Sequence, residues 1–173
     1  VAIHCMVDPL SMDKFLDDNG ENYVNDETVE RDWVVKACQH ADVYFNLLCA
    51  IGDCTKLRLT PHDGTLYEAF QERFGASLEV QVVSDDVLKS AAAKQEWRAF
   101  CQEFQNVVED YNFGTLVRLD CRGDYSESNT TLVPRVQFYA LEIARNRQGL
   151  NNGLRERFPA AGKSDSQSVP EDV

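Results

Sequence analysis

The sequence has no long apolar run and a shortage of basic side chains. Its longest apolar stretch, Val43 to Ile51, is interrupted by Asn46 and is too short to cross a bilayer. Lysine and arginine number 17 against 29 aspartates and glutamates, a formal net charge of −12. Chains that coat nucleic acid or anionic lipid need an excess of cations, so this balance argues against both partners. With no secretory pattern at the N-terminus, we expect a cytoplasmic protein.

Signatures of the common catalytic and cofactor sites are missing as well. The sequence contains no Walker-type phosphate loop, no GxGxxG after a strand, no Cys/His set at metal-binding spacing and no supported Ser-His-Asp order. The nearest carboxylate pair is Glu109-Asp110, whose side chains would point about 100° apart on a helix. His40 has no second ligand at a typical spacing, which favours a structural role. We therefore predict a non-enzyme without catalytic residues, metal or cofactor.

Cysteines are present but are not arranged as a disulfide framework. Six of them are scattered through apolar patterns, at positions 5, 38, 49, 54, 101 and 121. A chain of 173 residues with 43% hydrophobic residues can form a core without covalent links. Buried thiols are the simpler interpretation.

The stretch from Thr131 to Gly149 predicts a helix at the centre of the molecule. Pro134 suits a first helical turn, Arg145 and Arg147 suit a C-terminal turn, and Gly149 suits the position after it. Apolar residues cover most of its girth, and only Glu142 and Asn146 form a clear polar stripe. Such a helix is normally surrounded by other elements.

Other helices and two short strands follow from periodicity and capping residues. Helices are expected from about Asn25 to Ile51, from Asp63 to Gly75, over a single turn from Asp85 to Leu88, and from Ala91 to about Asn112. Leu78–Val82 and Thr115–Cys121 alternate as strands do and are predicted to pair with each other. The fold class is thus mainly α, a single-domain bundle of about four main helices with a small two-stranded β element.

The two ends of the chain differ in composition from its middle. Residues 1 to 24 carry five carboxylates against one lysine, and residues 151 to 173 are rich in Ser, Gly, Pro and charge. We therefore expect an acidic N-terminal arm (1–24), a helical globular domain (25–150) and a disordered C-terminal tail (151–173).

Three long segments resemble the polysaccharide biosynthesis domain-containing family of small eukaryotic proteins. The segments are Gln39–Tyr44, Val108–Leu116 continued by Arg118–Cys121, and Pro134–Arg147. The resemblance covers roughly Tyr23 to Asn151. It implies a cytosolic chaperone of newly made translation elongation factor 1-alpha, acting near the ribosome on the nucleotide-binding domain of that factor. An enzyme or accessory factor of polysaccharide biosynthesis remains the alternative.

A monomer that binds through protein–protein contact needs exposed contact groups, and arginine and tyrosine most often supply the energy of such interfaces. The candidate partner-binding residues are Tyr111, Arg118, Tyr125, Arg135, Arg145 and Arg147. For Arg145 and Arg147, an internal ion pair with Glu109, Asp110 or Asp120 is an equally consistent alternative to contact with a partner. The net charge of −12 suits a basic partner.

Overall fold

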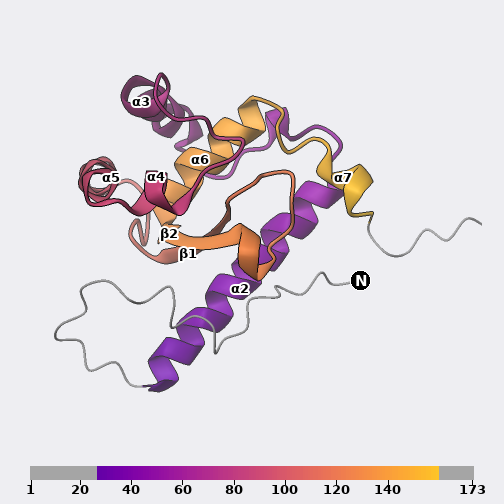
Figure 1. The fold of residues 1–173 in the computed structure, drawn as a ribbon, viewed down its shortest axis with the longest axis horizontal. Coiled ribbons are helices and arrows are strands. Elements are labelled where there is room, and N and C mark those ends of the chain that lie inside the picture. Colours follow the sequence, from indigo (N-terminus) through magenta and orange to yellow (C-terminus); the bar gives the residue numbers. More distant parts are fainter. Residues whose placement is uncertain (1–26, 160–173) are drawn as a thin grey trace, which may run out of the picture.

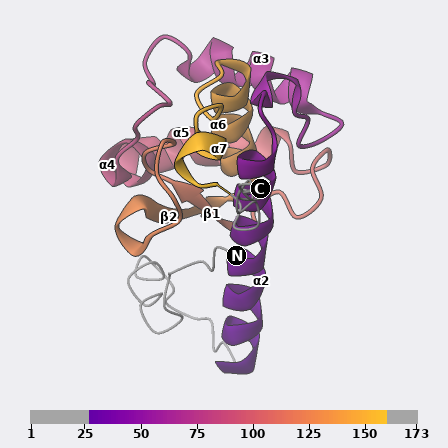
Figure 2. The same ribbon diagram turned by 90° about the vertical axis from the view of Figure 1, so that its right-hand side faces the viewer.

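The longest element among the described residues is helix α2 (Glu27–Ala50), which runs along one side of the molecule (Figure 1). The computed structural model describes residues 27–159, so the predicted acidic arm lies outside the described residues. Apolar residues three and four apart form the inward stripe of α2, as its periodicity predicts. The buried members of this stripe are Val34, Ala37, Ala41, Tyr44, Phe45 and Leu48. The first turns of the helix project beyond the other elements (Figure 2).

Three shorter helices follow α2 in the chain. After the 3-10 turn η2 (Cys54–Lys56) come α3 (Asp63–Phe74), α4 (Asp85–Lys89) and α5 (Ala91–Glu103). The side chains of Ser84 and Ser90 accept hydrogen bonds from Val87 N and Ala93 N, which explains where α4 and α5 begin. Helices α3 and α5 meet through aromatic side chains, with the rings of Phe74 and Trp97 stacked at 4.2 Å.

Helix α5 ends well before Asn112, so the predicted helix is too long. Beyond Glu103 the chain makes successive turns, in which the carbonyl of Phe104 accepts hydrogen bonds from Val107 N and Val108 N. These turns still bury Phe104 and Val108 at the spacing that suggested a helix. Apolar spacing alone therefore does not separate a helix from a series of turns here.

The sheet is small, antiparallel and differently paired from the prediction. Strand β1 (Gly114–Arg118) pairs with β2 (Thr130–Pro134), with Gly114 opposite Pro134 and Arg118 opposite Thr130. The expected partner, Leu78–Val82, contributes only an isolated bridge between Val82 and Asp120. The hairpin connection of residues 119–129, which contains η3 (Glu127–Asn129), brings β2 next to β1. Local hairpin closure involves a shorter loop than pairing with the distant segment would.

The central helix of the prediction is α6 (Arg135–Arg147), and it is almost entirely buried. Its expected first turn is wrong, because Thr131–Pro134 belong to strand β2 and Pro134 is the N-cap residue. Gly149 has a φ of +71°, the left-handed conformation that glycine provides after a helix end. Helices α2 and α6 both contact β1, which explains why Leu116, Val117 and Arg118 are all buried.

The described chain closes with α7 (Leu154–Arg157), which packs beside the C-terminal end of α2. Asn151 and Leu154, placed in the tail by the sequence analysis, are both buried in the domain. The rings of Phe158 and Phe45 lie 5.3 Å apart. The globular part therefore continues to Pro159, and residues 160–173 lie outside the described residues. Between Glu27 and Pro159 no helix is long and apolar enough to span a membrane.

Candidate functional site

A fully buried carboxylate, Glu142 of α6, lies at the centre of a polar cluster inside the protein. Its Oε1 accepts a hydrogen bond from Arg145 Nη1 at 2.7 Å, and its Oε2 accepts from Arg118 Nη2 at 3.3 Å. Tyr44 Oη and Asn151 Nδ2 also donate to Oε2, at 2.9 and 3.0 Å. These five residues come from α2, β1, α6 and the segment before α7. The cluster therefore connects elements that are far apart in the sequence.

The two arginines of this cluster also donate to backbone carbonyls. Arg145 donates to Val80 O at 2.7 Å, Arg118 O at 2.8 Å and Leu119 O at 3.1 Å. Arg118 donates to Cys121 O at 2.7 Å and to Asn151 Oδ1 at 2.9 Å. Two guanidinium groups share one carboxylate, and the carbonyl dipoles offset the remaining positive charge. The cluster thus holds the irregular segments around residues 80 and 120 against α6.

Charge pairing controls the ionisation of Glu142. Burial alone would raise the pKa of this carboxyl, but the Arg118 and Arg145 guanidinium groups outweigh it and lower the pKa to about 2. Burial, together with the Glu142 charge, raises the pKa of Tyr44 well above its ordinary value. Glu142 is therefore a carboxylate and Tyr44 a neutral donor at physiological pH.

Three of the predicted partner-binding residues belong to this interior and not to the surface. Arg118 and Arg145 have no exposed surface, and Tyr125 is only 3% exposed. The guanidinium of Arg118 lies 5.7 Å from the Tyr125 ring centre. Arg145 does form an internal ion pair, as the second of the two predicted alternatives has it. Its partner, however, is Glu142 and not Glu109, Asp110 or Asp120. In their folded positions these residues cannot contact a partner.

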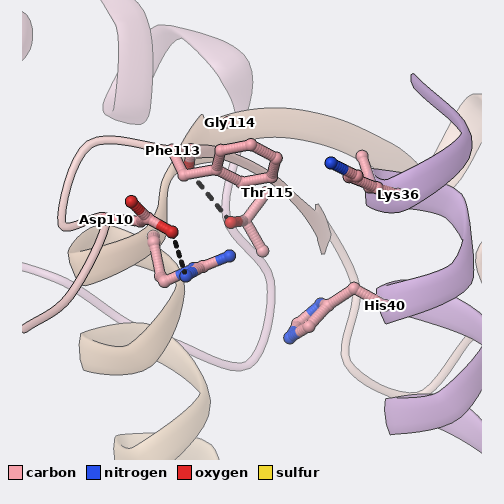
Figure 3. A pocket seen from close by; sticks show the side chains of 8 residues that line it. Lys36, His40, Asp110, Phe113, Gly114 and Thr115 are labelled. Carbon is pink, nitrogen blue, oxygen red and sulfur yellow. Dashed lines mark hydrogen bonds and ion pairs between the residues drawn. The ribbon is translucent and has the colours of Figure 1, made fainter. Parts of the chain in front are cut away.

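A pocket opens on the surface between the middle of α2 and the start of β1 and α6. It has a volume of about 170 Å³. Figure 3 shows Lys36 and His40 projecting from α2 toward the segment that contains Phe113 and Thr115. Arg135, the first residue of α6, completes the lining together with Ala37, Asp110 and Gly114.

Close packing and an unusual turn position the pocket residues. A Cβ atom on Gly114 would lie 2.3 Å from Trp33 Cζ2, so only glycine lets β1 approach α2 this closely. Asp110 has a φ of +51°, a left-handed conformation that aspartate adopts more readily than most residues. The turn at Asp110 is closed by a hydrogen bond from Phe113 N to Asp110 O at 2.8 Å.

Several polar groups of the pocket are only partly satisfied. Arg135 forms a 3.5 Å ion pair with Asp110, whose side chain is 65% exposed, and its guanidinium lies 4.9 Å from the Phe113 ring centre. The buried atoms Arg135 Nε and His40 Nδ1 have no hydrogen-bond partner among the described residues. Burial and the charge of Arg135 lower the pKa of His40, so the imidazole is neutral at pH 7.

The remaining predicted residues lie at or near the surface. Tyr111 is half-buried beside the pocket, and its carbonyl accepts a hydrogen bond from Val136 N at 3.0 Å. Arg147 is exposed at the far end of α6, with its guanidinium 4.3 Å from the Tyr67 ring centre. Of the six predictions, the structure places only Arg135 in the pocket lining. Lys36 and Phe113 lie outside the predicted set, and the role predicted for His40 is structural.

The lining of the pocket offers positive charge to an anion. Arg135 and Lys36 supply positive charge, and His40 supplies a ring nitrogen without a partner. Within residues 27–159 no group of His, Cys, Asp and Glu is arranged to hold a metal ion. The volume of about 170 Å³ is below the roughly 300–1,000 Å³ that is typical of small-molecule sites.

Comparison with known proteins places this fold in a family. The model of the family described as PBDC1 protein matches residues 29–156. Protein PBDC1 of Mus musculus is 48% identical over 134 residues, which cover 78% of this chain and 67% of the mouse protein. Protein PBDC1 of Homo sapiens is 46% identical over 134 residues, which cover 78% of this chain and 57% of the human protein. The match therefore spans little more than half the length of the human relative.

Relatives from yeast match over almost their full length. The Protein PBDC1 homolog of Saccharomyces cerevisiae is 43% identical over 139 residues, which cover 79% of this chain and 94% of the yeast protein. A solution NMR structure of a Saccharomyces cerevisiae protein superposes with a TM-score of 0.70 at 41% identity, covering 80% of this chain and 97% of that one. From the family model, these identities and the shared fold it follows that the chain belongs to the PBDC1 protein family.

Proposed function

We propose that this chain is a cytoplasmic chaperone that binds newly synthesised translation elongation factor 1-alpha through protein–protein contact, without catalysis. The identity of the client comes from the resemblance described in the sequence analysis. We assign the contact to the pocket lined by Lys36, His40, Phe113 and Arg135.

The observation that carries this proposal is the convergence of the three resembling segments on one opening. His40 belongs to the first segment, Asp110, Phe113 and Gly114 to the second, and Arg135 to the third. The same segments supply Arg118, Glu142 and Arg145 to the interior cluster, where no surface is left for a partner. At this pocket, residues of all three segments reach the surface together.

The size of the pocket and the net charge of the protein also support a binding role over an enzymatic role in sugar chemistry. A cavity of about 170 Å³ fits one side chain of a partner and is small for a nucleotide-sugar. The net charge of −12 favours encounter with a basic client at long range. We expect this long-range attraction to weaken as salt is added, because exposed charges are screened beyond about 10 Å. The nucleotide-binding domain of the client, met near the ribosome, is the proposed target.

Capture from a translation extract tests the proposal. Proteins made during a short labelling pulse are distinguished from the older pool, and an unrelated acidic protein of similar net charge serves as the control bait. We expect labelled elongation factor 1-alpha to be enriched over its unlabelled pool on this chain and not on the control. Equal enrichment on both baits, or turnover of nucleotide-sugars without any enrichment of the factor, would refute the proposal.

A further inference from the structure

We infer that the pocket between α2 and the start of α6 receives a carboxylate, carried by an aspartate or glutamate side chain of the bound protein. The identity of that protein rests on the proposed function, whereas the binding of a carboxylate rests on the pocket alone. The bound protein would thus place one acidic side chain in the pocket, although the net charge of this chain favours a partner that is basic as a whole.

Positive charge is concentrated in this pocket although the protein is acidic. Lys36 extends from α2 and Arg135 from α6, and both line the same opening. Lys36 is exposed and forms no ion pair among the residues that the structure describes. Two cations that converge from different helices attract an anion more strongly than either does alone. The long-range field of the protein repels anions, so only one that fits the pocket is retained.

Two buried atoms of the pocket lack the hydrogen bonds that such atoms normally make. Arg135 Nε carries a proton and has no acceptor among the described residues, and His40 Nδ1 has neither donor nor acceptor there. A buried polar group without a partner destabilises the folded state. A carboxylate can accept two parallel hydrogen bonds from one guanidinium, through Nε and a terminal nitrogen. A carboxylate that replaces the Asp110 contact would give the Arg135 guanidinium an acceptor.

The carboxylate of Asp110 marks the place that an incoming carboxylate would take. It lies 3.5 Å from Arg135 Nη1, a long contact, and its side chain is 65% exposed. An exposed ion pair of this kind contributes little stability, so a better-placed carboxylate can displace it. Asp110 is therefore a weak competitor within the chain.

The shape of the pocket restricts what can enter beside Arg135. The ring of Phe113 lies under the guanidinium, with 4.9 Å from ring centre to Arg135 Cζ, and orients its plane. The Thr115 hydroxyl donates to Phe113 O at 3.0 Å. The volume of about 170 Å³ admits a single side chain. A flat two-oxygen group that displaces the Asp110 carboxylate matches the planar guanidinium.

A small carboxylate in solution tests the pocket without any client. N-acetylglutamate amide is added to the full chain at constant ionic strength, and the Arg135 Nε–H and His40 imidazole resonances are followed by NMR. We expect saturable shifts, a dissociation constant on the order of millimolar, and an upward shift in the pKa of His40. Equal shifts with the neutral N-acetylglutamine amide would overturn the inference. Tighter binding of inorganic phosphate would overturn it in favour of a phosphate group.

Two substitutions should change this binding in opposite directions. Arg135→Gln should abolish the saturable shift of His40, whereas exposed Arg98→Gln on α5 should preserve it. Asp110→Asn should tighten binding about two- to five-fold, because the competing carboxylate is lost while asparagine keeps the left-handed turn. Asp86→Asn, which removes the same charge from exposed α4, should change the dissociation constant less. No gain in Asp110→Asn, or an equal gain in Asp86→Asn, would contradict the competitor role.

The same variants separate this inference from the proposed function. If the wild-type chain captures elongation factor 1-alpha, Lys36→Gln and Arg135→Gln should reduce capture at least several-fold while Arg98→Gln retains it. Undiminished capture by both pocket variants would overturn the inference and leave the chaperone proposal standing. Failure of the wild-type chain to capture the factor, together with saturable binding of N-acetylglutamate amide, would refute the chaperone proposal and support the carboxylate site.

Discussion

Arg145 and Arg135 lie at opposite ends of the same helix, yet their guanidinium groups have very different surroundings. All three side-chain nitrogens of Arg145 donate hydrogen bonds, to Glu142 and to three backbone carbonyls, and none of its surface is exposed. Arg135 packs on the Phe113 ring and has only two long polar contacts, an ion pair with exposed Asp110 and a hydrogen bond to Glu109 O, both at 3.5 Å, while its buried Nε has no partner among the described residues. Every guanidinium nitrogen of Arg145 is hydrogen-bonded within the protein, whereas Arg135 keeps a nitrogen without a partner among the described residues.

This contrast shows how a helix with little exposed surface can serve two purposes. The C-terminal half of α6 supplies buried charge that holds irregular segments in place, and its first turn supplies a cation to the pocket. Arginine suits both positions because its planar group forms several directed hydrogen bonds and also packs on aromatic rings. Substitutions in the two halves should therefore differ in what they damage, stability in one case and binding in the other.

The largest effect is expected from Glu142→Gln. This change leaves Arg118 and Arg145 buried without their carboxylate, and breaking a buried ion pair in this way costs about 3–5 kcal/mol. Urea unfolding, followed by circular dichroism, measures the loss. The matched control is Glu103→Gln, whose ion pair with Arg73 is exposed and worth less than about 1 kcal/mol. Similar losses in both variants would mean that the buried cluster contributes no more than a surface pair.

Acidification should remove the contribution of Glu142 to the free energy of unfolding in a defined pH range. Because its pKa in the folded protein is lowered to about 2 from 4.5, its stabilising contribution is complete above the unfolded value and declines as pH falls toward 2. The contribution is on the order of 3 kcal/mol. We therefore expect the stability difference between wild type and Glu142→Gln to narrow between pH 4.5 and the lowest accessible pH, as measured by urea midpoints. A constant difference would show that the carboxyl has an ordinary pKa.

A smaller loss is expected from Gly114→Ala, at the junction of the two regions. The new methyl group would collide with the Trp33 ring, and relief requires a shift of β1 or α2 that costs about 1–3 kcal/mol. Gly64→Ala is the control, because its new Cβ would meet no atom within 4 Å. We expect the control to be neutral or more stable by up to about 1 kcal/mol in thermal unfolding. Equal behaviour of the two variants would mean that the packing against Trp33 is loose.

The smallest effect on stability should come from Arg135→Gln. Its ion pair with Asp110 is exposed on one side, so the loss should stay below about 1 kcal/mol. The informative readout is the NMR titration of His40. Burial is the larger cause of its lowered pKa and the charge of Arg135 the second, so removal of that charge should raise the pKa toward its ordinary value without reaching it. An unchanged His40 pKa would indicate that the two side chains do not interact across the pocket.

Sequence patterns were sufficient for elements whose signals are local. The stripe of α2, the serine caps of α4 and α5, and Gly149 after α6 each depend on residues within a few positions, and the structure confirms them. The errors concern segments whose structure is decided by contacts with residues far away in the sequence. Thr131–Pro134 has features of both a first helical turn and a strand, and only its pairing with β1 decides between them. The segment Leu78–Val82 does not pair with β1 as predicted, because β2, which is closer in the sequence, takes that position.

The candidate site was predicted less well, for a related reason. Nothing near Arg118 in the sequence shows that Glu142, Tyr44 and Asn151 surround it, because those contacts join residues that are far apart in the chain. Glu142 was interpreted as part of a polar stripe because a helical pattern gives the direction of a side chain but not what lies in that direction. Lys36 was not selected because a lysine on an amphipathic helix is ordinarily a solvated surface residue. Its proximity to Arg135 appears only after folding.

The position of Asn151 has a consequence for the way this chain is made. Its side chain bridges Arg118, Glu142 and Asn146, and Phe158 soon after it packs on Phe45 of the first described helix. A growing chain that has released only the segments up to α6 cannot close this interior, since its last partners are still in the ribosome. Local pieces such as the β1–β2 hairpin can form early, but the long-range contacts must wait. The domain should therefore reach its native state only after synthesis has passed well beyond Phe158.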